Sequence, residues 1–315
     1  MGPEEDLPTL LSRKDHLGVL HYLRSHQLRK PELVIEHAFS LFGGPELSKA
    51  KPKSSSFLLP SSGIDEAECL AALEQLCLAA IDVQDHKLAD RCLNIIRESV
   101  SKESTRFRRL LALCLESAGD MEGAENIYDS LLKENPSNGF ALKRKYCILR
   151  SQPGKEVEAS TALNDYIERN MGDTSAWNEM ATLCMDMGDY KGAAYCYEEV
   201  VIGSPLSDAV HCKMGEIYAT VGGIENLKLA RKHMAQSLEL NPENLRALYG
   251  LVASACAFLD EMEVAGKNKR DSEELDVDVA KELVKYGAEK LMKCYKGTKM
   301  ALVVGKFLEA QSVNE

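Results

Sequence analysis

The feature that most constrains the fold of this chain lies between Thr174 and Pro205. Four residues in this segment have the spacing that is typical of a repeat built from two paired helices. Trp177 is followed sixteen residues later by Ala193, and then by Tyr197 and Pro205. Two antiparallel helices can approach closely only where a small side chain such as Ala193 lies between them. Because proline cannot continue a helix, Pro205 is expected just beyond the second one. The segment therefore predicts a helix–turn–helix unit.

The same spacing returns on both sides of this unit. Ala124, Tyr128 and Pro136 stand at matching positions upstream, and Ala230 and Pro242 stand at them downstream. Weaker copies are carried by Ala89, Leu93 and Ile96, and by Ala159, Leu163 and Tyr166. A period of about 34 residues with this pattern is typical of tetratricopeptide repeats, in which stacked helix pairs build an extended binding surface.

The pattern predicts an all-α fold, a tetratricopeptide-repeat solenoid with capping helices at both ends, since strand-like alternation is scarce. The expected parts are a helical segment over 1–42, a linker or insertion over 43–64, the repeat array over 65–260, a charged loop over 261–276 and capping helices over 277–315. The interval from Pro205 to Pro242 is about three residues longer than one repeat, and we expect the extra residues in the turn at Gly222 and Gly223. The last long helix is expected to bury a stripe formed by Val279, Leu283, Tyr286, Leu291 and Cys294.

Composition and motifs argue against several function classes. The net charge of −11 disfavours general nucleic-acid binding. The ten cysteines are scattered without a C-x-x-C pair, so we expect reduced thiols in helix cores, as in a reducing compartment. His16, His21 and His26 lie five residues apart, which does not bring them to one helix face. Phosphate-loop, zinc-protease and nucleophile-elbow motifs are missing, and no apolar run is long enough to span a bilayer. We expect no enzyme activity, no cofactor and no metal.

The candidate binding residues lie on the first helices of successive units, because these helices line the inner face of such arrays. Helical spacing places there Lys143, Arg144, Cys147, Arg150, Asn178, Thr182, Asp186 and Glu216. Basic runs at 143–145, 231–233 and 267–270 are expected to be solvated. Of the three, the run at 143–145 is the better candidate for contact with an acidic partner segment or anionic lipid headgroups.

Four stretches between Pro136 and Leu251 resemble the family of endoplasmic reticulum membrane protein complex subunit 2, also called tetratricopeptide repeat protein 35. They read NPSNGFALKRKYCILRSQPGK, ALNDYIERNMGDTSAWNEMATLC, DYKGAAYCYEEVVIGSP and YATVGGIENLKLARKHMAQSLELNPENLRALYGL. The last is the most specific, because generic tetratricopeptide proteins lack its GG-x-EN-L turn. The first 64 residues depart from the family pattern, and 277–295 is loosely similar to it.

The resemblance implies a non-catalytic scaffold subunit, peripheral on the cytoplasmic face of the endoplasmic reticulum membrane. It also implies support for inserting transmembrane segments of tail-anchored and multipass proteins. The implied partners are other subunits of that complex, namely cytosolic parts of membrane subunits and an MPN-like soluble subunit. The alternatives are a cytosolic chaperone adaptor that clamps a C-terminal carboxylate, another interaction scaffold, an enzyme or its regulatory subunit, and an RNA-processing scaffold. The acidic Asp186 and Glu216 leave a carboxylate clamp incomplete, and the overall acidity disfavours an RNA scaffold.

Overall fold

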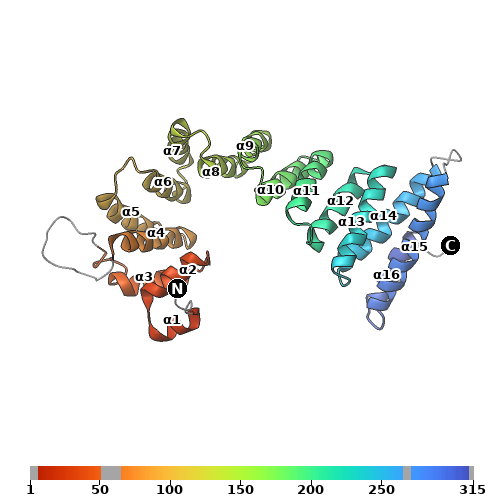
Figure 1. Ribbon diagram of the computed structural model, residues 1–315, viewed down its shortest axis with the longest axis horizontal. Helices are drawn as coiled ribbons and strands as arrows, with labels where there is room; N and C mark the ends of the chain where they lie inside the picture. Colours follow the sequence, from red (N-terminus) through yellow and green to blue (C-terminus); the bar gives the residue numbers. More distant parts are fainter. Residues whose placement is uncertain (1–5, 51–64, 265–270, 312–315) are drawn as a thin grey trace. The chain divides into compact units, whose positions relative to one another are not determined.

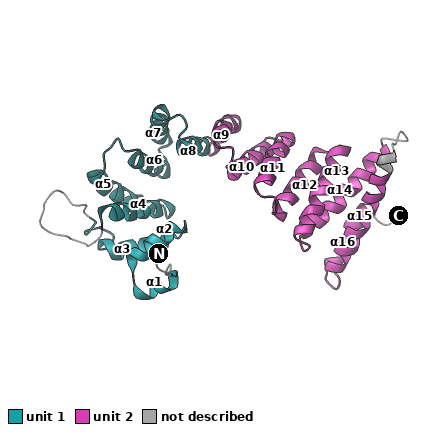
Figure 2. Ribbon diagram, in the orientation of Figure 1, with its two compact units in different colours: residues 1–148 teal, residues 149–315 magenta. Residues whose placement is uncertain are grey.

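The structure is a computed structural model that describes residues 6–50, 65–264 and 271–311. These residues form α-helices and no strand, which confirms the expected all-α, tetratricopeptide-type fold. Figure 1 shows the helices in chain order, and Figure 2 shows the two compact units into which the chain divides, Met1–Ile148 and Leu149–Glu315.

The described part of unit 1 is built from consecutive helices, and α8 runs across its boundary. They are α1 (Leu7–Arg13), α2 (His16–Ser25), α3 (Pro31–Phe42), α4 (Glu66–Asp82), α5 (His86–Ser99), α6 (Thr105–Ala118), α7 (Met121–Glu134) and α8 (Gly139–Arg150). After α3, Leu47 and Ala50 are buried in a turn segment, so the first residues of the expected linker pack onto the core. Residues 51–64 of that linker lie outside the described residues.

Unit 2 continues the succession of helices. They are α9 (Glu156–Arg169), α10 (Thr174–Asp186), α11 (Tyr190–Gly203), α12 (Asp208–Val221), α13 (Ile224–Leu240), α14 (Leu245–Val264), α15 (Asp271–Cys294) and α16 (Ala301–Ala310). No helix among the described residues combines the length and the apolar character needed to cross a membrane.

The helix pairs α6–α7, α10–α11 and α12–α13 are each closed by an alanine on the second helix. Ala124 on α7, Ala159 on α9, Ala193 on α11 and Ala230 on α13 are all fully buried. Tyr128 fills the adjacent space in its pair and is also fully buried. The prolines at 136, 205 and 242 each lie one residue beyond the C-cap of a second helix, where a missing N–H costs nothing. The helix pair is therefore the packing unit of both halves.

The second helices of two pairs begin with the same kind of side-chain cap. Asp120 and Asp189 are the N-cap residues of α7 and α11, and their carboxylates accept hydrogen bonds from the backbone N–H of Gly123 and Gly192, each at 2.9 Å. This satisfies an N–H group that has no partner inside the helix. A Cβ built on Gly192 would lie 2.3 Å from Oδ2 of Asp189. An alanine at Gly192 would therefore require the Asp189 carboxylate to shift from this position.

The extra residues before Pro242 are helical, so the expected insertion in the Gly222–Gly223 turn is wrong. Helix α13 has 17 residues, whereas α11 has 14. The addition lengthens the N-terminal end of α13, while Gly222 and Gly223 form a short turn with positive φ. A helical extension keeps its backbone hydrogen bonds inside the helix, which a longer loop would not.

The C-terminal helices are longer than expected, and α15 buries a different face from the one that the sequence predicts. Helices α14 and α15 extend into the segment 261–276 that was expected to be a loop, of which 265–270 lies outside the described residues. The buried face of α15 carries Ala280, Val284, Gly287 and Leu291, whereas Val279, Tyr286 and Cys294 of the expected stripe are exposed. A Cβ on Gly287 would lie 2.4 Å from Cγ2 of Val252. Close approach to α14 therefore selects the face with small residues.

We predict that Asp189→Ala lowers the free energy of unfolding by about 1 kcal/mol, because the cap hydrogen bond to α11 is lost. Gly192→Ala should also destabilise the protein, since its Cβ collides with the Asp189 carboxylate. In the Asp189→Ala background the collision disappears, so Gly192→Ala should instead stabilise the helix by up to about 1 kcal/mol. Urea unfolding of the four proteins measures this coupling, with Asp278→Ala as the exposed control. Additive effects would contradict the cap geometry.

Candidate functional site

The predicted binding residues lie on first helices, and several are engaged with acidic or basic groups one helix pair away. In unit 1, the Arg144 guanidinium on α8 donates to the Glu116 carboxylate on α6, with Nε 3.1 Å from Oε1. Tyr128 donates its hydroxyl to the same carboxylate from α7. The hydrogen bond to Glu116 raises the pKa of Arg144, and burial raises the pKa of Tyr128. Glu116 thus joins three helices.

Unit 2 repeats this arrangement on α8 and α10. The Arg150 guanidinium donates to the carboxylate of Asp186. Asn178, also on α10, accepts a 2.8 Å hydrogen bond from the Tyr197 hydroxyl of α11. The Thr182 hydroxyl donates within its own helix to the carbonyl of Asn178. Four of the predicted residues therefore make hydrogen bonds within the protein. Two of these bonds connect different helices, and the third lies within α10.

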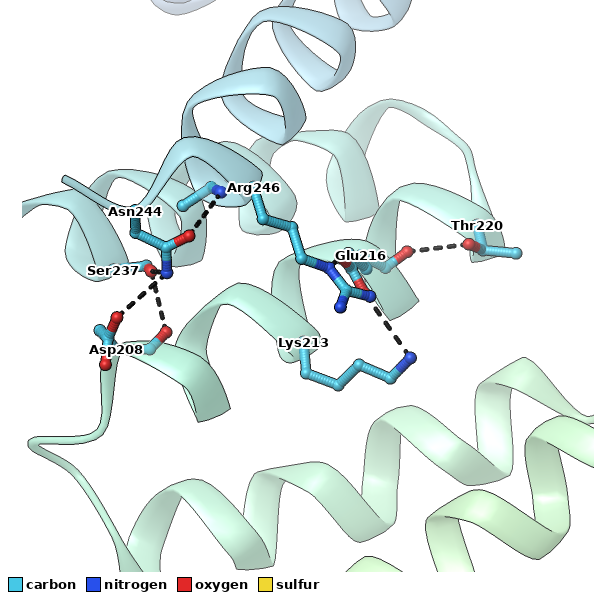
Figure 3. Close-up of polar contacts among 8 residues, drawn as sticks. Asp208, Lys213, Glu216, Thr220, Ser237, Asn244 and Arg246 are labelled. Carbon is cyan, nitrogen blue, oxygen red and sulfur yellow. Dashed lines mark hydrogen bonds and ion pairs between the residues drawn. The ribbon is translucent and has the colours of Figure 1, made fainter. Parts of the chain in front are cut away.

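Glu216 on α12 is the centre of a third contact (Figure 3). It accepts hydrogen bonds from the Arg246 guanidinium on α14, at 2.8 Å from Nη2, and lies 3.5 Å from Nζ of Lys213. The hydrogen bond raises the pKa of Arg246. Nearby, the Asn244 amide donates to Asp208 at 3.1 Å, so α14 is tied to α12 at two points.

Two of the basic runs contain side chains that are engaged within the protein itself. In the run 143–145, Arg144 is paired with Glu116, and Lys145 lies 2.6 Å from Asp129. In the run 231–233, Arg231 is buried with its guanidinium 4.0 Å from the centre of the Phe258 ring, and burial lowers its pKa. The expectation of a solvated face is therefore wrong for Arg231, because its aliphatic stem and planar head fill the core between α13 and α14. The run 267–270 lies outside the described residues.

Sequence reasoning missed Glu116 and Arg246, which complete two of these contacts. A signal was available: the paired charges are separated by 28, 36 and 30 residues, which is close to one repeat. Opposite charges one repeat apart on adjacent first helices are placed to meet. Lys143 and Cys147 are half-buried on α8.

A groove of about 620 Å³ opens between α9, α10 and α11. Its walls include Trp177, Met171, Tyr195 and Met180, with Glu168 and Glu199 at polar positions. Trp177 is half-buried, donates from Nε1 to the carbonyl of Met171 at 2.8 Å and meets Tyr195 edge-on with ring centres 6.1 Å apart. The signature tryptophan therefore lines a groove instead of filling the centre of the helix pair.

We predict that Trp177→Ala lowers the free energy of unfolding by about 1–3 kcal/mol, less than the about 3–5 kcal/mol typical of a fully buried tryptophan. The reason is that the Trp177 side chain is only partly buried in the folded protein. Thermal and urea unfolding measure the loss, with the exposed Ile202→Ala as the control. A loss above about 4 kcal/mol would show that Trp177 belongs to the core.

A histidine pair links α12 to α13. Nε2 of His211 donates to the carbonyl of Pro205 at 3.0 Å, so its Nδ1 accepts from Nδ1 of His233 at 3.1 Å. Only one proton can lie between the two facing Nδ1 atoms, so the contact is lost when both rings are doubly protonated. Burial, followed by the charge of His211, lowers the pKa of His233 below its ordinary value of 6.5, while Glu198 acts in the opposite direction.

We predict that the protein loses stability as pH falls from about 7.5 to about 5.5. Because the folded pKa of His233 is depressed, the unfolded chain binds more protons in this range, and each such group contributes at most about 1.4 kcal/mol per pH unit. His233→Gln should flatten the pH dependence of the unfolding free energy. The exposed His21→Gln should follow the wild type, and an unchanged slope in His233→Gln would contradict the pairing.

All ten cysteines are free thiols, and eight of them are buried. Burial raises the pKa of Cys92 and of Cys196 to about 12, which keeps both thiols protonated at neutral pH. Among the described residues no group of three or more His, Cys, Asp or Glu side chains is placed to hold a metal ion.

Comparison with known proteins identifies the repeat domain. Residues 87–238 match the model of the EMC2 TPR-like repeat domain. ER membrane protein complex subunit 2 of Xenopus tropicalis is 37% identical over 199 residues, which cover 63% of this chain and 66% of that protein, just under two thirds of its length. The protein of the same name from Dictyostelium discoideum is 29% identical over 253 residues, 77% of this chain and 74% of that one.

A solved structure supports the fold. The C-terminal part of a TPR repeat-containing protein from Cytophaga hutchinsonii has a TM-score of 0.50 and 11% identity, over 95% of this chain and 97% of that one. This likeness concerns the fold alone. Through the repeat domain at 87–238, the chain belongs to the family of ER membrane protein complex subunit 2.

Proposed function

We propose that this protein is a non-catalytic scaffold subunit of an endoplasmic reticulum membrane protein complex. The match of residues 87–238 to the EMC2 TPR-like repeat domain carries the proposal, supported by relatives that are named as subunit 2 of that complex. In this role the chain is peripheral on the cytoplasmic face and supports insertion of transmembrane segments of tail-anchored and multipass proteins. It holds cytosolic parts of membrane subunits and an MPN-like soluble subunit together.

The contacts between first helices suggest how such a scaffold works. Arg150 with Asp186 and Arg246 with Glu216 tie neighbouring first helices of unit 2 to each other. The arrangement of polar groups is therefore set before a partner arrives, which lowers the entropy cost of docking. Lys143, Arg144, Cys147, Arg150, Asn178, Thr182, Asp186 and Glu216 are the residues that we propose to face partner segments.

The chaperone-adaptor alternative is weaker. A carboxylate clamp needs several lysine and arginine side chains available to one peptide terminus. Here Arg144 pairs with Glu116, Arg150 with Asp186 and Arg246 with Glu216. Tight binding of a peptide with an acidic C-terminus, lost on Arg150→Glu, would favour the adaptor.

Affinity purification of the tagged chain in mild detergent, followed by mass spectrometry, tests the scaffold role. The proposal expects recovery of a defined set of endoplasmic reticulum membrane subunits together with a soluble MPN-type protein. Recovery of chaperones with C-terminal acidic motifs, without membrane subunits, would contradict it.

We predict that Lys143→Glu combined with Arg150→Glu weakens this co-purification without unfolding the protein, because exposed ion pairs contribute only about 0–1 kcal/mol to stability. Circular dichroism checks folding, and the exposed Lys232→Glu is the matched control. Arg150→Asp with Asp186→Arg keeps the pair but exchanges its charges. If partners contact the Arg150 charge, the exchange restores stability without restoring recovery. Full recovery of both variants would exclude this face as the docking surface.

A further inference from the structure

The outward side of the last helix carries an apolar patch. Met300, Leu302 and Val303 are 51%, 78% and 56% exposed. We call these three residues the C-terminal patch. They lie at the start of α16, the helix at the C-terminal end of unit 2 in Figure 1.

The patch lies on the exposed face of α16, and the other face of this helix packs against the core. Val304 and Leu308 are buried in a cluster that includes Leu251 and Leu291. Phe307 meets the Tyr249 ring edge-on, with ring centres 5.2 Å apart. Helix α16 is therefore fixed on α14 and α15 with aliphatic side chains left outside. A terminal cap of a repeat array ordinarily presents a polar outer face.

The surroundings of the patch are basic in a chain that is otherwise acidic. Residues 281–310 contain seven lysines and three glutamates, a net charge of +4, whereas the whole chain carries −11. Lys296, Lys299 and Lys306 are exposed and lie next to the patch in the sequence. Exposed aliphatic groups flanked by lysines match an anionic lipid surface, in which the apolar side chains enter the acyl boundary and the ammonium groups meet phosphates.

We propose that the C-terminal patch and its three flanking lysines dock this protein directly on a bilayer that contains anionic phospholipid. The charge complementarity of the lysines selects this occupant over a purely apolar partner. The proposal goes beyond the scaffold role and does not depend on it, because it assigns a lipid contact to the chain without other subunits.

Co-sedimentation of the purified full-length chain with vesicles tests the proposal. The chain should bind vesicles of phosphatidylcholine with phosphatidylserine, should bind phosphatidylcholine alone much less, and should be released as ionic strength rises. Reversal of Lys296, Lys299 and Lys306 to glutamate should weaken binding by about a hundredfold or more, at roughly fivefold per lysine removed.

The apolar part of the contact has its own variant and control. Leu302→Ser with Val303→Ser should weaken binding at least about tenfold, since two buried aliphatic groups are lost. Ile202→Ser with Leu206→Ser changes side chains that are 72% and 83% exposed near the end of α11, and should leave vesicle binding unchanged.

A spectroscopic readout places the contact at this end of unit 2. Cys294 is the exposed thiol at the end of α15, so an environment-sensitive dye can be attached there in a Cys147→Ser background. Its emission should shift to the blue on phosphatidylserine vesicles and should not shift in the three-lysine variant.

Several outcomes would overturn the proposal. One is no binding of the wild type to phosphatidylserine vesicles at low ionic strength. Another is equal loss of binding in the Ile202→Ser, Leu206→Ser control. A third is patch-dependent binding of polyglutamate without vesicle binding, which would assign the surface to an acidic protein partner.

Discussion

The close approach of two helices at a buried alanine is the constraint on which the other features of each unit depend. Ala124, Ala193 and Ala230 leave no exposed surface, and each occupies the equivalent repeat position of a second helix. A small side chain there sets the separation of the pair. That separation brings the Tyr128 and Tyr197 hydroxyls within reach of acceptors on their first helices.

The charged side chains of the first helices pair with one another inside the protein, before any partner binds. Glu116 and Glu216 each accept hydrogen bonds from an arginine of the next first helix. Such pairs are individually weak near solvent, but they fix which charges stand side by side. A partner that docks on the first helices of either unit meets a preset arrangement of both signs, in keeping with the proposed scaffold role. The C-terminal patch has a different chemistry, because it consists of exposed apolar side chains with exposed lysines next to them in the sequence.

The sequence predicted most of the fold because the repeat spacing is local information. Ala193, Tyr197 and Pro205 locate a helix pair without reference to distant residues. The buried face of a helix was harder to predict where it is set by tertiary contacts. The face of α15 was predicted wrongly because Gly287, which has no hydrophobic side chain, packs closely against Val252 of α14. The site was predicted in part: first-helix positions follow from the period, whereas the burial of Arg231 on Phe258 depends on α14, which lies beyond local pattern.

The most direct test of the account is the free energy of unfolding of Ala193→Leu, measured in urea beside the exposed control Ala209→Leu. If close approach at the alanine holds the pair together, Ala193→Leu should cost about 1–3 kcal/mol through overpacking. The control should stay within about 0.5 kcal/mol of the wild type. Equal stability of Ala193→Leu and the wild type would contradict the account, because the helices would then not depend on a small residue at their contact.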